Sequence, residues 1–241
     1  MALSGGAVSR AGLQGDRRIT VGAGLGVAAG VLLGVLPSLL FTVLYSGSTG
    51  ALPLGASLFQ TTGLLLMAGA LLFLLSFSFY RWGFSRWRHQ DARFDGPVAL
   101  CLVGSIGALA VVAAGIAIYS SPSAIEHCLH GRPSEWSTCL FGLSPYAALA
   151  TTVGIVGGAL GGIGLVAGFG LVARKVRSAA LAAGAGVYGL LWILGAASLL
   201  GPVFGSAALR PLLITLPWVA VLAPLLVLAG ASRALIVPLR S

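Results

Sequence analysis

The feature that most constrains the fold is a set of six long stretches that contain no Asp, Glu, Lys, Arg or His. Each has at least 20 residues, enough for a helix rising 1.5 Å per residue to cross about 30 Å of hydrocarbon. Lipid offers no partner to backbone amides, so such a segment must form a helix or join a closed barrel. The six stretches are 19–45, 52–80, 97–119, 146–172, 179–204 and 212–231.

Unbroken apolar runs lack the alternation of a membrane barrel, so the sequence predicts an all-α polytopic membrane protein with six transmembrane helices. Composition agrees, because 58% of the residues are hydrophobic and only 8% are charged, against about a quarter charged in soluble domains. The run at 19–45 exceeds the apolar core of a signal peptide, so we expect it to remain as the first helix. We predict a single transmembrane domain, residues 1–241, in the cell membrane.

The basic residues predict the orientation of these helices. The formal net charge is +9, and twelve of the basic residues fall on one side if the six helices alternate. The positive-inside rule then places both termini in the cytoplasm. Because topology accounts for most of the basic excess, charge pattern alone does not support nucleic acid as a partner, although it leaves that partner open. The twelve are Arg10, Arg17, Arg18, Arg81, Arg86, Arg88, Arg93, Arg174, Lys175, Arg177, Arg233 and Arg240.

The segment after the second apolar run, "RWGFSRWRHQDARFD", interleaves aromatic and basic residues. We interpret it as a cytoplasmic interface in which aromatic rings lie at the headgroup level and arginines reach toward water. The alternative is a binding site for anionic headgroups, a partner protein or nucleic acid. The residues assigned to this interface are Arg81, Trp82, Arg86, Trp87 and Arg88.

Two apolar stretches carry glycine at every fourth position, which places the glycines on one helix face. Small residues at this spacing allow helix backbones to approach closely. The sequence leaves open whether the contacts lie within one chain or between chains. Nucleotide binding is excluded here, because a dinucleotide fingerprint must lie between a strand and a helix. The glycines are Gly22, Gly26, Gly30 and Gly34 in the first stretch and Gly154, Gly158 and Gly162 in the fourth.

Polar side chains inside the apolar stretches are few. Coupled transporters and proton pumps usually place ionisable groups in the bilayer, and the stretches contain none. All three histidines lie outside them, so we predict no haem or other cofactor and no metal. The polar groups favour hydrogen bonds between helices, and the alternative is a polar path through the bundle. The candidate pore-lining residues are Gln60, Thr61, Thr62, Thr151 and Thr152.

The connection "EHCLHGRPSEWSTC" gathers cysteine, histidine and acidic residues on the predicted external side. An oxidising compartment and a short turn-forming loop favour a disulfide between Cys128 and Cys139. A zinc site with His127 and His130 is the weaker alternative, because the spacing matches no common zinc motif. A nucleophilic cysteine lacks an orienting partner in the loop.

The two glycine faces, the helix end "FYRWGFSRWR" and the external cysteine loop together resemble the layout of small Gly- and Ala-rich polytopic membrane proteins of hyperthermophilic archaea. That group includes the polytopic membrane component of the archaeal DNA-import system. The resemblance implies a role in translocation and transfers no functional residue.

The expected function is therefore a channel or translocation component without its own active site, as in DNA import or another multi-subunit membrane apparatus. One alternative is an accessory or structural subunit of an energy-transducing membrane complex. A further alternative, which we disfavour, is a membrane enzyme that uses the external loop. The expected partners are membrane lipid and either other membrane subunits or further copies of the chain.

Overall fold

The computed structural model describes residues 10–35, 56–119, 145–199 and 218–232, and within them every long element is a helix. Helix α1 spans Arg10–Gly30 and continues as the π-helix η1, Val31–Val35. Helix α3 spans Ala56–Arg88, and the 3-10 turn η2, Ala92–Phe94, leads into α4, Asp95–Tyr119. Helix α7 spans Pro145–Val176, α8 spans Ala179–Leu199, and a last helix spans Trp218–Ser232.

Four of these helices are long and apolar enough to cross a membrane: Gly15–Val35, Met67–Arg88, Ala92–Ala117 and Thr152–Val176. Of two shorter apolar helices, Ala179–Ile193 falls within the fifth predicted stretch, and Trp218–Ser232 overlaps the sixth and passes its end by one residue. The all-helical class is thus confirmed for the described residues. Six membrane crossings, and cytoplasmic termini, stay predictions.

The helices extend beyond the apolar runs into charged sequence. Helix α1 begins at Arg10 rather than at residue 19, and α3 continues to Arg88 rather than ending at residue 80. Apolar runs mark what can lie in hydrocarbon, whereas helical hydrogen bonds continue wherever no proline or cap ends them. The predicted stretches therefore located the helices but not their ends.

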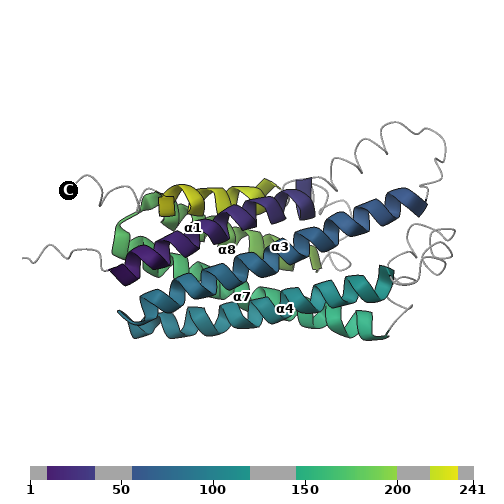
Figure 1. Cartoon of the computed structure of the whole chain (residues 1–241), viewed down its shortest axis with the longest axis horizontal. Coiled ribbons are helices and arrows are strands. Elements are labelled where there is room, and N and C mark those ends of the chain that lie inside the picture. The colour runs from purple at the N-terminus through teal and green to yellow at the C-terminus, as the bar shows by residue number, and fades with distance from the viewer. Residues whose placement is uncertain (1–9, 36–55, 120–144, 200–217, 233–241) are drawn as a thin grey trace, which may run out of the picture.

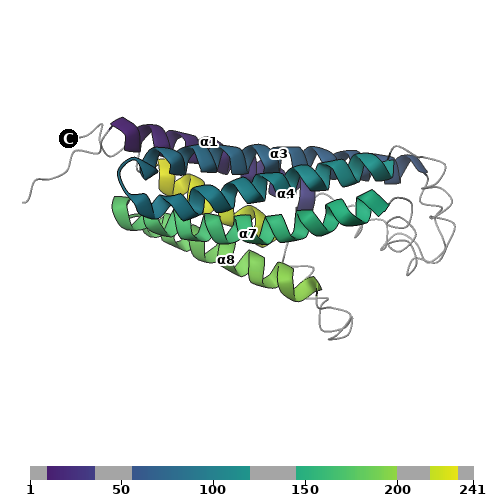
Figure 2. The same ribbon diagram turned by 90° about the horizontal axis from the view of Figure 1, so that it is seen from below.

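The helices form a closed ring. Helix α1 packs on α3, α3 on α4, α4 on α7 and α7 on α8. The last helix closes the ring, because Gly184 and Leu181 of α8 lie against Val227 and Gly230, while Gly30 of α1 lies against Ala220. The long axes run roughly side by side along the bundle (Figure 1), and the last helix lies between α1 and α8 (Figure 2).

The interior of the ring is filled by large side chains. A buried cluster joins aromatic side chains of α3 and α7 with aliphatic side chains of α1 and the last helix. The Phe169 ring of α7 lies at its centre, 4.9 Å from the Tyr80 ring, 5.3 Å from the Phe84 ring and 5.6 Å from the Tyr188 ring. Such edge and offset contacts stabilise aromatic clusters beyond their area burial. Around Phe169 the ring of helices therefore has a packed core.

The glycines of α1 pack within the chain. A Cβ at Gly22 would lie 2.9 Å from the Tyr80 ring of α3, and one at Gly30 would lie 2.8 Å from the Ala220 carbonyl oxygen of the last helix. Gly26 faces both neighbours, because its Cβ position lies 3.1 Å from Pro224 and 3.2 Å from Ser76 Oγ. Gly34 lies in η1. Each four-residue step turns a helix by about 40°, so the glycine face passes from one neighbour to the next.

The glycines of α7 divide between two neighbours in the same way. Gly154 faces Val111 of α4, whereas Gly158 and Gly162 face the Trp192 ring of α8. Close backbone contacts with α4 are made by Gly157 and by other glycines of α7 that lie outside the four-residue series. A Cβ at Gly157 would lie 2.8 Å from the Gly107 Cα. The further members of this α4–α7 seam are Gly104, Gly161 and Gly164, whereas Gly168 of α7 faces the Phe84 ring of α3.

Candidate interaction surface at the basic end of the bundle

The described basic residues gather at one end of the ring. The start of α1 meets the end of α3, where a Cβ at Gly15 would lie 2.9 Å from Trp87 Nε1. Lys175 near the end of α7 reaches Asp91, just before η2, and Leu181 near the start of α8 lies against Gly230 of the last helix. We call this the basic end. Its described basic residues are Arg17, Arg18, Arg81, Arg86, Arg88, Arg93, Arg174, Lys175 and Arg177.

An aromatic row runs from the interior to this end. Phe94 of η2 lies 6.2 Å from the Phe84 ring and is stacked 6.2 Å from the Trp87 ring. Trp87 is only 4% exposed, so it belongs to the core rather than to the predicted interface. Trp82 is 50% exposed and carries the Arg18 guanidinium 5.6 Å from its ring. The two tryptophans five residues apart therefore differ in role, because they lie on different faces of α3.

Two ion pairs lie at the turn between α3 and α4. Arg88 Nε lies 3.0 Å from Asp95 Oδ1, and Lys175 Nζ lies 3.1 Å from Asp91 Oδ2. Lys175 also lies 5.8 Å from the Trp87 ring centroid. The Arg93 backbone N–H donates to Asp91 Oδ1 at 3.0 Å. The pKa of Asp91 lies below its ordinary value, mainly because of this backbone hydrogen bond and secondly because of the Lys175 ammonium group.

A buried carboxylate, Asp16, lies in this region and was not singled out from the sequence. It is 1% exposed, and its Oδ2 has no hydrogen-bond partner among the described residues. Trp87 faces Asp16, yet its Nε1 also completes no hydrogen bond of standard geometry with a described residue. The sequence places Asp16 before the first apolar run, among charged residues. The close glycine contact at Gly15 brings it against α3.

Deeper in the ring, two tyrosine hydroxyls meet. Tyr80 and Tyr188 have their oxygens 3.2 Å apart, and both side chains are buried. Ser76 Oγ donates to the Gly22 carbonyl oxygen at 2.8 Å, which ties α3 to α1. These groups join α1, α3 and α8 by hydrogen bonds. Their pairing is structural, as expected for buried polar groups.

The candidate pore-lining residues lie toward the opposite end of the bundle. Gln60, Thr61 and Thr62 are in the first turns of α3, and Thr151 and Thr152 are in α7. The side chain of Thr152 is exposed, and the other four side chains lie outside the described part. A shared polar path therefore stays a prediction.

The cysteine loop with Cys128, Cys139, His127 and His130 lies outside the described residues, so the disulfide stays a prediction. Cys101, on α4, is buried with a free thiol. Among the described residues, no three His, Cys, Asp or Glu side chains lie close enough to hold a metal ion.

No protein-family model matches the chain, and no curated protein or solved structure is significantly similar to it.

Proposed function

We propose that the protein is a non-catalytic, membrane-embedded subunit of a larger membrane assembly, and that its basic end contacts the partner. The observation that carries the proposal is the filled interior of the ring. Tyr80, Phe84 and Phe169 occupy the space where a conduit toward the basic end would pass, and each is at most 1% exposed. A subunit that binds partners fits a packed interior better than a channel component does.

The basic end supplies the means of recognition. The ion pairs engage Arg88 and Lys175, and the remaining described arginines exceed the described acidic side chains there, which are Asp16, Asp91 and Asp95. Unbalanced charge of one sign steers a partner of opposite charge and orients its docking. We therefore expect the partner to present acidic groups at the membrane surface. A translocation apparatus, including one for DNA import, is one assembly that would contain such a subunit.

Affinity purification in mild detergent, with identification of the co-purifying proteins, tests this role. The wild-type chain is expected to retain a stoichiometric partner, and Arg17→Glu combined with Arg86→Glu is expected to release it. Gly24→Ala serves as the control, because beyond the local backbone of α1 no atom lies within 4 Å of a Cβ at Gly24. That variant should retain the partner.

Two outcomes would contradict the proposal. One is a wild-type chain that carries lipid but no other protein. The other is ion or solute flux through liposomes that contain the purified chain alone, which would establish the conduit instead.

A further inference from the structure

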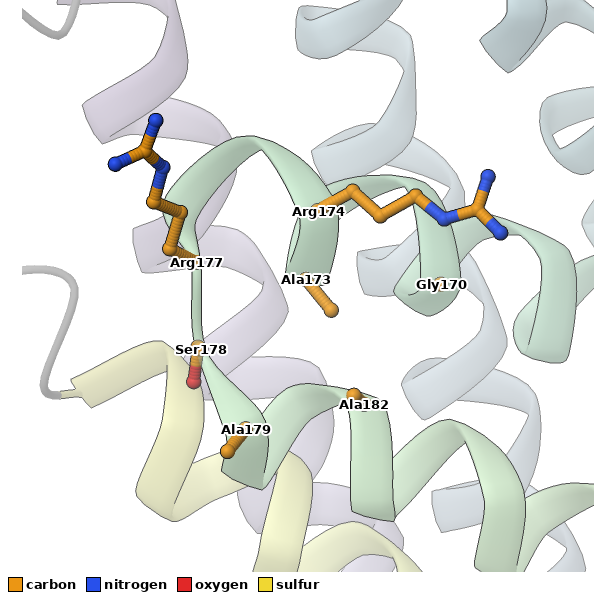
Figure 3. Close-up of a pocket in the computed structure, with 7 residues that line it drawn as sticks. All are labelled: Gly170, Ala173, Arg174, Arg177, Ser178, Ala179 and Ala182. Atoms are coloured by element: carbon orange, nitrogen blue, oxygen red, sulfur yellow. The ribbon is translucent and has the colours of Figure 1, made fainter.

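A groove of about 410 Å³ opens on the outside of the bundle where α7 ends and α8 begins. It is lined by Gly170, Ala173 and Arg174 of α7, by Arg177 and Ser178 of the turn, and by Ala179 and Ala182 of α8 (Figure 3). The groove lies at the basic end, where the candidate span Thr152–Val176 stops. It therefore lies at the level where hydrocarbon gives way to the polar headgroup region.

A tight turn builds the groove. Arg177 has a positive φ of 51°, and the Ser178 N–H donates to the Ala173 carbonyl oxygen at 3.1 Å, as in a helix end closed by a left-handed residue. Ser178 Oγ then accepts a hydrogen bond from the Leu181 N–H at 3.4 Å and so caps the start of α8. The turn is fixed by its own hydrogen bonds, so the groove is a preformed feature.

The floor of the groove is small and apolar. Gly170 has open space where its Cβ would lie, and the alanines beside it present only methyl groups. Below the groove, large apolar side chains face outward on both helices, with Ile163 57% exposed on α7 and Ile193 67% exposed on α8. An acyl chain can follow this surface toward the middle of the membrane, whereas a free polar ligand gains nothing from it.

The rim of the groove is cationic. Arg174 and Arg177 both line it, and their side chains extend in different directions, with the Arg177 guanidinium group directed away from the alanines of the floor (Figure 3). Neither forms an ion pair with the described acidic side chains, of which Asp91 pairs with Lys175, Asp95 pairs with Arg88 and Asp16 is buried. A guanidinium group binds a phosphate through two parallel hydrogen bonds. Holding one phosphate above the groove therefore requires both arginine side chains to turn toward it.

We propose that this groove is a binding site for one anionic phospholipid. The headgroup phosphate lies between Arg174 and Arg177, and the acyl chains lie along the apolar faces of α7 and α8. The site takes its lipid from the surrounding membrane and is independent of the partner contact proposed above. Lys175, which follows Arg174 in α7, points instead to Asp91 and Trp87 and takes no part.

Native mass spectrometry of the purified chain in detergent, titrated with phosphatidylglycerol or phosphatidylcholine, tests the site. The wild-type chain is expected to hold one phosphatidylglycerol more tightly than phosphatidylcholine. Each arginine near a membrane surface strengthens the binding of an anionic lipid. Arg174→Gln combined with Arg177→Gln should therefore weaken phosphatidylglycerol binding about thirtyfold. The matched control, Arg17→Gln with Arg86→Gln, removes the same charge from the same end and should leave the binding unchanged.

A second variant tests the groove itself. Gly170→Leu keeps both arginines and fills the floor with a side chain that meets no atom at its Cβ, so we expect it to lose phosphatidylglycerol binding while its melting temperature stays near that of the wild type. Equal loss in the matched control would show diffuse surface charge rather than a site. Displacement of the lipid by millimolar inorganic phosphate would show a site for free phosphate. Either result would overturn the proposal.

Discussion

Buried hydroxyl groups show what a single residue contributes to this bundle. Tyr188 has Tyr80 as its partner in the core, whereas the Tyr80 hydroxyl also lies within reach of Ser76. Removing one member of a buried hydrogen-bonded pair costs more than removing both, because it leaves the other group unpaired. Removing the hydroxyl group of Tyr80 and removing that of Tyr188 should therefore have different effects on stability.

We expect Tyr80→Phe to lower the free energy of unfolding by about 1–2 kcal/mol, because it leaves the Tyr188 hydroxyl without a partner. Tyr188→Phe should lower the free energy of unfolding by less, since the Tyr80 hydroxyl retains Ser76 as a partner. Thermal denaturation in detergent measures both variants and the double variant. The double variant should be more stable than the sum of the single effects predicts. Additive losses would show that the two hydroxyls do not interact.

Asp91 makes the stability of the protein depend on pH in a definite direction. Its pKa is lowered from the ordinary value of 3.8, so its stabilising contribution is complete above that value and is lost as pH falls through the lowered pKa. Asp91→Asn should therefore have a slightly lower melting temperature than the wild type at neutral pH. The difference should shrink in acid and disappear once the wild-type carboxylate is protonated. A difference that grows in acid would contradict the pairing with Arg93 N–H and Lys175.

At the scale of elements, the seam between α4 and α7 depends on backbones that touch. A Cβ at Gly107 would lie 2.9 Å from the Gly157 backbone, and backbone cannot move aside as a flexible side chain can. Overpacking of this kind typically costs about 1–3 kcal/mol. One methyl group added in this seam should therefore lower the stability of the bundle substantially.

Gly107→Ala and Gly157→Ala should each lower the melting temperature in detergent, with a loss of about 1–3 kcal/mol in the free energy of unfolding. Gly186→Ala on α8 is the matched control, because open space surrounds its Cβ position. That control should be neutral or slightly stabilising, since alanine favours helix. Equal effects at all three positions would contradict the close approach of α4 and α7.

The sequence predicted the helices but not which faces they share. Apolar runs are a direct consequence of the membrane environment, so the helical class and the approximate positions could be predicted. A spacing of four identifies glycines that lie near one another on a helix, yet the face drifts, and Gly154 and Gly162 consequently contact different neighbours. The burial of Asp16 and Trp87 could not be predicted, because it depends on how α1 and α3 cross.

At the scale of the molecule, the antiparallel order of the helices brings the described basic side chains to one end. The sequence contains a single lysine, Lys175, whose side chain is 31% exposed. A membrane-impermeant amine reagent should modify Lys175 in inside-out vesicles and not in right-side-out vesicles, because the basic end is predicted to face the cytoplasm. Detergent-solubilised protein, which should be modified, is the control. Modification only in right-side-out vesicles would reverse the topology.

The mass of the native particle bears most directly on the proposed role as a subunit. Native mass spectrometry of the protein released from its own membrane in mild detergent should give a particle heavier than one 24.2 kDa chain with bound lipid, in a fixed ratio with at least one partner protein. A particle that contains a single chain and lipid alone would contradict that role.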